Sequence, residues 1–284
     1  MAHPAQSTFT IDGQRLAYTS YGEGPRTTVL VHGLLLSQRM HERLARSLAD
    51  RGNRVITIDL LGHGRSDRPA DMWRYSMVSF GAEVIALLDH LELDEAVVLG
   101  TSLGANTALE AAALAPERLR GMVIEMPVLD NALLGSVLAF TPLMVALTFG
   151  EPAMRLLSAA ARLVPPLPWA ADLVLDTVRQ DPRPSAAVLQ GLFFGRVAPP
   201  REERRAIQTP ALVIGHLHDI VHPFSDAGML VNELPNGRLL QATSILELRL
   251  SPERLTGEIA EFLDDCWRPR TAERPPNRRK RAAS

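Results

Sequence analysis

Short apolar runs alternate with longer amphipathic stretches along most of this chain. The short runs are rich in valine, isoleucine and leucine, which is typical of strands buried on both faces. They lie at Thr27–Val31, Val55–Asp59, Ala96–Gly100, Met122–Met126, Ala211–Gly215 and Arg238–Gln241. Apolar residues recur at helical spacing in Gln38–Asp50, Ser76–Leu91 and Leu103–Ala115. This alternation predicts an α/β fold with a mostly parallel sheet and helices on both of its faces.

The ends of the chain depart from this pattern. Phe9–Ile11 and Gln14–Thr19 flank an Asp-Gly pair typical of tight hairpins, so we expect the sheet to open with an antiparallel edge. Residues 1–8 are expected to be an N-terminal tail. Beyond the last predicted helix, Pro252–Asp265, residues 268–284 are rich in proline and arginine and are expected to be a disordered basic tail.

The strand–helix alternation stops after Met126 and resumes at Thr209. We interpret the apolar, proline-rich residues 127–207 as a helical cap, inserted into an α/β core of residues 9–126 and 208–267. Within this cap, Asn131–Gly150 carries no charge and is long enough to span a bilayer. A glycine and a proline interrupt it, so cap helices folded over the core are favoured over a transmembrane span. A lid that rests on lipid is the alternative.

Composition narrows the function classes. The chain has 284 residues, 46% of them hydrophobic and 22% charged, which suits a single α/β domain with an insertion. A formal net charge of −2 gives no overall field that would attract nucleic acid, so no nucleic-acid partner is expected. The single Cys266 excludes an internal disulfide, and Met1–Thr10 shows no secretory signal, so we expect a cytoplasmic protein. The oligomeric state is not predicted.

One motif suggests nucleophilic catalysis. Gly100-Thr101-Ser102-Leu103-Gly104 follows a predicted strand and opens a predicted helix. This is G-x-S-x-G in the strand–turn–helix context that exposes a serine hydroxyl at the carboxyl edge of a sheet. The positive end of the following helix then points at the place where negative charge develops during acyl transfer. Ser102 is therefore the candidate nucleophile.

Two further segments follow the first parallel strands: Val31-His32-Gly33-Leu34 and the glycine-rich stretch from Asp59 to Asp67. With the serine motif, they make the chain resemble the capped single-domain serine hydrolases of the α/β-hydrolase superfamily, from Phe9 to Cys266. The resemblance implies that the backbone amides of Leu34 and Leu103 form the oxyanion hole. It also implies that His32 and His63 support their loops by hydrogen bonding rather than acting as bases.

The resemblance also implies a catalytic carboxylate. Such hydrolases carry an aspartate after the next-to-last strand, in a D-x-[IV]-x-P setting, and Asp219, Val221 and Pro223 match it. An aspartate there orients the catalytic imidazole and stabilises its charged form. Asp219 is therefore the candidate acid, and Asp130, after the preceding strand, is the alternative.

The expected histidine is not at its usual place. Counting back from Pro252-Glu253, the position that usually holds it is Ile245, and no histidine follows His222 in the chain. A serine hydroxyl without an adjacent base is a weak nucleophile. His216, His218 and His222 flank Asp219, so one of them is a candidate substitute base. The same imidazoles could ligate a metal, but their spacing is unlike that of common zinc motifs, and no metal is expected.

These observations favour a hydrolase that acts on a lipophilic ester or thioester through Ser102, with weak or unconventional catalysis. A non-catalytic ligand-binding pseudo-hydrolase is the alternative. Eight apolar cap residues either pack the cap onto the core or line a pocket, and in the second case a small lipophilic substrate or ligand is the expected partner. They are Leu133, Leu134, Phe140, Phe149, Leu156, Leu157, Phe193 and Phe194. No dinucleotide or phosphate-binding glycine motif is present, so no cofactor is expected.

Overall fold

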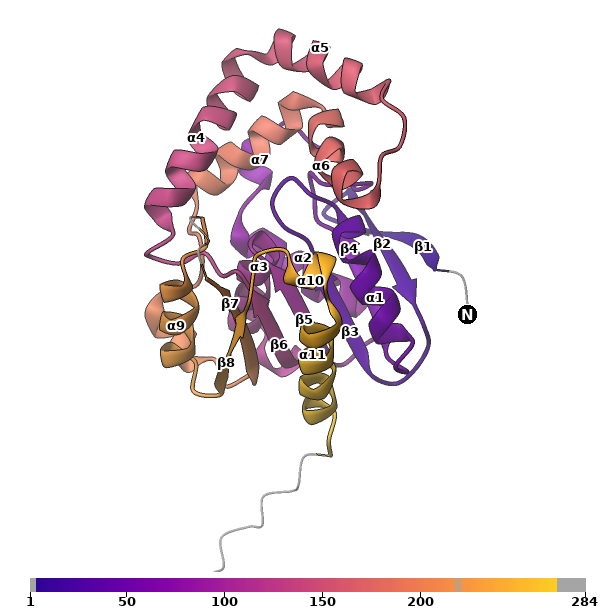
Figure 1. Cartoon of the computed structure of the whole chain (residues 1–284), viewed down its shortest axis with the longest axis vertical. Helices are drawn as coiled ribbons and strands as arrows, with labels where there is room; N and C mark the ends of the chain where they lie inside the picture. Colours follow the sequence, from indigo (N-terminus) through magenta and orange to yellow (C-terminus); the bar gives the residue numbers. More distant parts are fainter. Residues whose placement is uncertain (1–3, 218, 220, 270–284) are drawn as a thin grey trace, which may run out of the picture.

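In the computed structural model, which describes residues 4–217, 219 and 221–269, eight strands form one sheet in the order β1-β2-β4-β3-β5-β6-β7-β8 (Figure 1). The strands are β1 (Ala5–Ile11), β2 (Gln14–Tyr21), β3 (Thr27–Val31), β4 (Arg54–Asp59), β5 (Ala96–Thr101), β6 (Leu119–Glu125), β7 (Ala211–His216) and β8 (Gly237–Ala242). The pairs β1–β2 and β2–β4 are antiparallel and the other pairs are parallel. The predicted mostly parallel sheet with an antiparallel edge is confirmed.

The local sequence explains both kinds of strand. Every residue of β3, β5 and β7 is buried, as expected for strands that are covered on both faces. The β1–β2 hairpin closes at Asp12 and Gly13, whose φ angles of 48° and 75° are those that a two-residue turn requires. Strand β1 begins at Ala5, so the hairpin takes in part of the segment predicted as an N-terminal tail.

Helices cover both faces of the sheet. One face packs against α1 (Glu42–Ala49) and α11 (Glu253–Cys266). The other packs against α2 (Met77–His90), α3 (Leu103–Leu114) and α9 (Phe224–Glu233). The predicted helix at Gln38–Asp50 is split into a 3₁₀ turn, η1 (Gln38–His41), and α1. Shorter elements are η2 (Met72–Arg74), η3 (Pro116–Arg118), α8 (Arg201–Ala206) and α10 (Glu247–Leu250).

Four helices lie between β6 and β7, in the segment that we interpreted as a cap. They are α4 (Leu133–Phe149), α5 (Glu151–Arg162), α6 (Trp169–Arg179) and α7 (Pro182–Phe194). Prolines stand at the first turns of α5 and α7, where the missing N–H costs no helical hydrogen bond. Together the four helices arch over the sheet, with α4 rising from the core and α5 crossing the top (Figure 1).

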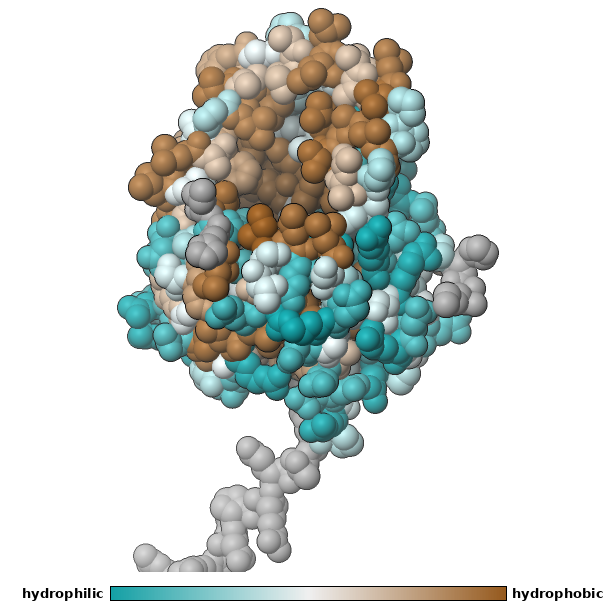
Figure 2. All heavy atoms as spheres, viewed as in Figure 1, coloured by the Kyte–Doolittle hydropathy of each residue, from teal (hydrophilic) through white to brown (hydrophobic). Residues whose placement is uncertain are grey.

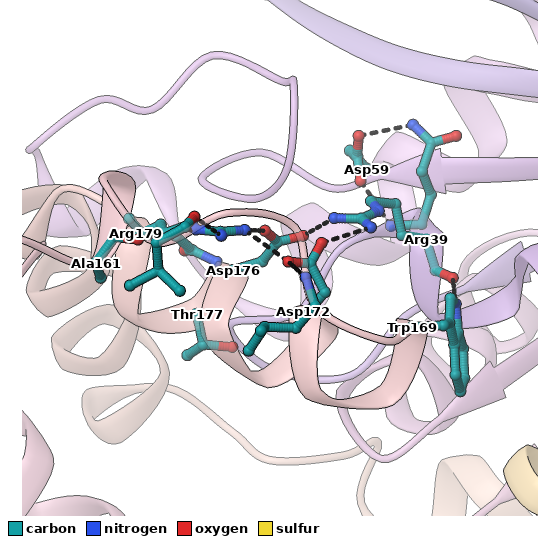
Figure 3. A network of polar contacts seen from close by, with 12 residues as sticks. Arg39, Asp59, Ala161, Trp169, Asp172, Asp176, Thr177 and Arg179 are labelled. Atoms are coloured by element: carbon teal, nitrogen blue, oxygen red, sulfur yellow. Dashed lines mark hydrogen bonds and ion pairs between the residues drawn. The ribbon is translucent and has the colours of Figure 1, made fainter.

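A polar network holds the far end of this arch to the core (Figure 3). Arg39, on η1, pairs with Asp172 at 2.9 Å and also with Asp176, both on α6. Arg179 pairs with the same two carboxylates at 3.0 and 3.1 Å. The near end is held by Asn106 on α3, whose amide nitrogen donates to backbone carbonyls on both connections of the cap, at Val128 and Val197, with distances of 2.8 Å each.

The described residues contain no single helix long and apolar enough to cross a membrane. The pair α4 and α5 passes the same test of length and composition only when the two are taken together, and they are bent by 98° at their junction.

Candidate active site

Ser102 lies in a sharp turn between β5 and α3. Its φ of 55° and ψ of −112° place it in a sparsely populated backbone region, as the motif predicts for a nucleophile elbow. A Cβ on Gly100 would clash with the backbone of Gly104, and one on Gly104 would clash with the backbone at Val31. The two glycines are therefore required by the close approach of three backbone segments.

The structure brings three of the predicted residues into one hydrogen-bonded chain. His222 Nε2 lies 2.9 Å from Ser102 Oγ, and its Nδ1 lies 2.9 Å from Asp219 Oδ2. The serine is thus in contact with an imidazole, and a carboxylate holds the imidazole from the other side. In this arrangement Nε2 can accept the serine proton while Asp219 fixes the tautomer.

Local hydrogen bonds make Asp219 and His222 a single unit. The backbone amides of Val221 and His222 donate to Asp219 Oδ1 at 2.9 and 3.0 Å, as in an Asx-type turn. Partial burial opposes ionisation of this carboxyl, but the hydrogen bonds from the His222 ring and from the two amides outweigh it. The pKa of Asp219 is therefore lowered below its ordinary value, and the group is a carboxylate at neutral pH. Asp130, by contrast, is exposed.

The other candidate positions lie elsewhere. His216 is buried at the end of β7, where its Nδ1 donates to the Ser244 carbonyl at 2.8 Å and its Nε2 lies 3.4 Å from Glu125 Oε1. His218 lies outside the described residues. Ile245 is 44% exposed. Of the three histidines considered as substitute bases, the structure therefore places His222 against the serine and turns His216 toward a different carboxylate.

A buried charge cluster beneath the elbow was missed from the sequence. Glu125, at the end of β6, accepts hydrogen bonds from Thr101 and, at 2.7 Å, from Arg249. Burial opposes ionisation of Glu125, but Arg249 and His216 outweigh it and lower its pKa. The same pairing outweighs burial at His216 and raises the pKa of that histidine. An acidic residue directly after the apolar run Met122–Ile124 was the signal that could have revealed this cluster.

Leu34 and Leu103 lie in the turns that follow β3 and β5. Leu34 is a central residue of a turn closed by the Leu36 amide, which donates to the Gly33 carbonyl. Leu103 is the first residue of α3, so its amide has no acceptor within the helix. Both residues border the same cavity as Ser102. These are the positions that the resemblance implies for an oxyanion hole.

His32 and His63 are fully buried and hydrogen-bond to the loops that follow β3 and β4. His32 Nε2 accepts from the Leu60 amide at 3.1 Å, and its Nδ1 donates to the Gly33 carbonyl at 2.8 Å. His63 Nδ1 donates to the Leu61 carbonyl at 2.9 Å. Burial lowers the pKa of both imidazoles, so they are neutral structural groups.

A cavity of about 250 Å³ opens at Ser102, beneath the arch of the cap. Figure 2 shows it as a hollow lined by apolar side chains. Among the residues that the structure describes, no charged one lines it. Its lining is Leu34, Met77, Ser102, Leu103, Asn106, Val128, Leu133, Ser136, Val137, Phe140, Thr141, Met144, Leu189, Leu192, Phe193 and Val197. Of the eight apolar cap residues named from the sequence, three line the cavity, and the other five are exposed elsewhere on the cap: Leu134, Phe149, Leu156, Leu157 and Phe194.

Within residues 4–217, 219 and 221–269, no three His, Cys, Asp or Glu side chains gather in a way that could hold a metal ion.

Comparison with known families agrees with this geometry. A family model described as the alpha/beta hydrolase fold matches residues 28–238. The chain belongs to the α/β-hydrolase family. The match takes in the elbow, the loop of Asp219 and His222 and the whole helical insertion, so the residues brought together here lie in a hydrolase fold.

Curated relatives of this α/β-hydrolase catalyse different reactions. An epoxide hydrolase of Caballeronia sordidicola is 33% identical over 111 residues, which are 39% of this chain and 33% of the relative. A haloalkane dehalogenase of Mycolicibacterium paratuberculosis is 30% identical over 168 residues, which are 58% of this chain and 51% of the relative. The chain therefore spans about a third to a half of the length of these relatives.

Solved structures match over a greater length. The enol-lactonase from Burkholderia xenovorans LB400 superposes with a TM-score of 0.73 at 22% identity, covering 91% of this chain and 100% of that one. An esterase from Thermogutta terrifontis gives 0.73 at 21% identity, covering 93% and 99%. At such identities the likeness establishes the fold alone.

Proposed function

We propose that this α/β-hydrolase cleaves a lipophilic carboxylic ester or thioester, with Ser102 as nucleophile, His222 as base and Asp219 as the residue that orients the base. The observation that carries the proposal is the continuous contact Ser102–His222–Asp219, with both distances at 2.9 Å. The base is unconventional because it comes from the same loop as the acid, three residues beyond it.

The geometry suits an acyl-transfer mechanism. Ser102 Oγ attacks the carbonyl carbon as its proton passes to His222 Nε2, and the carbonyl oxygen becomes an oxyanion near the amides of Leu34 and Leu103. When the tetrahedral intermediate collapses, the imidazolium returns the proton to the leaving alcohol or thiol. A water molecule, deprotonated by the same imidazole, then hydrolyses the acyl-enzyme and frees Ser102.

The cavity supports the lipophilic part of the proposal. Its lining offers no charge to pair with an ionic substrate, and leucine, valine, methionine and phenylalanine dominate it. Burying one methylene contributes about 0.8 kcal/mol, which is about fourfold in kcat/KM. We therefore expect kcat/KM to rise with acyl length by up to about fourfold per methylene until the cavity is full.

The test is turnover of p-nitrophenyl esters of increasing acyl length. Ser102→Ala and His222→Ala should each lower kcat by at least about a thousandfold. His90→Ala is the matched control, because His90 lies on the outer end of α2, and it should stay within about twofold of the wild type.

Two results would contradict the proposal. Full activity in His222→Ala would place the base elsewhere. Turnover no higher than the Ser102→Ala background, together with thermal stabilisation by a lipophilic ester, would indicate a ligand-binding protein instead.

A further inference from the structure

Helix α4 is apolar on all sides, although it lies at the surface of the protein. None of its residues, Leu133–Phe149, is charged, and Leu147 is the only one that is buried. One side borders the cavity through Val137, Phe140 and Met144, among others. A helix that is hydrophobic all round is normally enclosed by protein or by lipid, and here protein encloses only one side.

The opposite side of α4 is a continuous apolar stripe. Leu134, Leu138, Val145 and Phe149 recur at helical spacing and are 71%, 67%, 45% and 82% exposed. The stripe continues onto α5, where Leu156 is 73% exposed, and just beyond that helix, where Leu163 is 85% exposed. We call α4, α5 and Leu163 the hook. In Figure 2 apolar side chains cover the hook, while the core below it is mostly hydrophilic.

The core helices show what an ordinary surface looks like in this molecule. The exposed positions of α11 are Glu253, Arg254, Glu261, Asp264 and Asp265, all of them charged. Helix α1 likewise exposes Arg43 and Arg46. Large exposed apolar side chains are therefore concentrated on the hook, although the core also exposes some, such as Trp73 at 80% and Leu114 at 54%.

The exposed stripe does not face the rest of the chain. Helix α5 is fastened on its inner side, where Ser158 Oγ donates to the carbonyls of Arg179 and Gln180 at 2.9 and 2.8 Å. The α6 end of the arch is held by the network around Arg39 (Figure 3). With its inner side occupied in this way, the hook presents its leucines outward.

We propose that the hook is a membrane-docking surface that rests in the headgroup–acyl boundary of an anionic bilayer. Its charges fit such a position. The hook carries one acidic residue, Glu151, which is paired at 2.6 Å with Arg155. Arg155 is exposed, so it can lay its stem along apolar surface and reach a lipid phosphate with its guanidinium group, whereas Arg162 Nε donates to the Arg179 carbonyl at 2.9 Å.

The shape of the hook favours lipid over a second copy of the chain. A stable dimer interface needs about 800 Å² of mutually complementary surface on each partner. The two helices meet at 98°, so the outer side is a bent ridge that an identical ridge cannot match along both arms. A fluid bilayer conforms to such a ridge. Neither helix alone is long enough to cross the bilayer, which fits a position in its surface.

Helix α4 lies between the proposed bilayer contact and the cavity at Ser102. The same helix α4 that faces outward with Leu138 borders the cavity of Ser102 with Phe140 and Met144. A lipophilic molecule dissolved in the bilayer would therefore be one helix away from the serine. The docking proposal itself does not depend on the proposed hydrolysis, because binding to vesicles is measured without turnover.

The experiment is flotation of the full chain with vesicles of phosphatidylcholine mixed with phosphatidylglycerol. We expect the wild type and Ser102→Ala to float equally. Leu138→Asp/Leu156→Asp should lower the partition coefficient by at least about tenfold. The charge-matched control is Leu114→Asp/Gln208→Asp, at exposed positions near the opposite edge of the sheet, and it should bind within about twofold of the wild type.

A second measurement separates insertion from loss of folding. An environment-sensitive dye on Leu138→Cys should shift to the blue when vesicles are added, whereas the same dye on Leu114→Cys should not. Wild type that stays with the unbound fraction at every lipid concentration would overturn the proposal. So would a dimer in light scattering that the Leu138→Asp/Leu156→Asp variant abolishes, because the hook would then be a self-association surface.

Discussion

At the scale of single residues, the spacing of Asp219 and His222 explains how the proposed base can come from an unusual place. The Asx-type turn fixes the carboxylate against two backbone amides, and the imidazole three residues later folds back onto its second oxygen. The loop therefore orients its own histidine without help from a distant segment. Such local preorganisation lowers the entropy that is lost when the reacting groups are aligned.

This geometry predicts the effect of restoring a histidine at the usual place. In Ile245→His, we expect kcat on a p-nitrophenyl ester to stay within about threefold of the wild type, because Ser102 Oγ is already hydrogen-bonded to His222 Nε2. The matched comparison is His222→Ala/Ile245→His against His222→Ala. A gain above about tenfold from Ile245→His in the wild-type background would mean that His222 is a poor base.

A second residue-scale prediction concerns Glu83, which is fully buried on α2. Burial raises its pKa from 4.5 to about 8, although the Leu61 amide, which donates to it, acts in the opposite direction. Between these pH values the unfolded chain has lost this proton and the folded chain keeps it. The free energy of unfolding therefore falls as the pH rises through this window.

Replacing the carboxyl by an amide should remove this pH dependence. As the pH rises from about 5 to about 8, the wild type should lose stability from this carboxyl, whereas Glu83→Gln should not. The melting temperature of the variant should therefore rise relative to that of the wild type. Glu117→Gln is the control, because Glu117 is an exposed carboxylate. Its difference in melting temperature from the wild type should not change with pH. A pH-independent difference for Glu83→Gln would show that Glu83 is ionised throughout.

The residues of the candidate site differ in how far the sequence could predict them. Ser102 was predictable because its strand, turn and helix are contiguous. Asp219 rested on the pattern that it forms with Val221 and Pro223. The sequence narrowed the candidate base to three histidines near Asp219 but could not choose among them, because the Nε2–Oγ contact joins residues 120 positions apart. Glu125 was missed because its partners Arg249 and His216 come from different elements.

At the scale of elements, the two connections of the cap are tied to the core beside the elbow. Asp226 at the start of α9 is fully buried and accepts hydrogen bonds from the amides of Leu129, Asn131 and Ala132 at 2.7 to 3.0 Å. It thereby satisfies the backbone groups at the entry to α4.

The strands were predictable to within a few residues from their β-branched runs. The path of α4 was not, because a helix apolar on all sides has no single buried face.

Asp226 therefore provides an element-scale prediction. Asp226→Asn replaces one acceptor oxygen with an NH₂ group that faces backbone donors. The buried amides then lose a partner, at about 1–3 kcal/mol. A fall of roughly 3–10 °C in melting temperature follows for a chain of this size. Asp130 lies in the same connection between β6 and α4 but is exposed, so Asp130→Asn should change the melting temperature by less than about 2 °C. Equal melting temperatures for the two variants would contradict this role.

At the scale of the whole molecule, two differently built parts meet at Ser102. The core is a sheet between charged-surface helices, and the arch above it is apolar both toward the cavity and, on the hook, toward the outside. The arch has little charge of its own near the hook and depends on polar ties at its two ends. Its stability against local opening should therefore be set by these ties rather than by the stability of the core.

Arg39 tests this dependence, because it joins η1 of the core to two carboxylates of α6. Arg39→Met keeps the aliphatic stem but removes the ties, so trypsin should cleave after Arg155 and Arg162 several-fold faster, while core fragments persist. Mass spectrometry of the early fragments identifies the cut sites. Arg46→Met is the matched control, because Arg46 also pairs with a carboxylate, Glu42, at 2.8 Å, but within its own helix. Equal cleavage rates in the two variants would show that the arch is held by its apolar contacts alone.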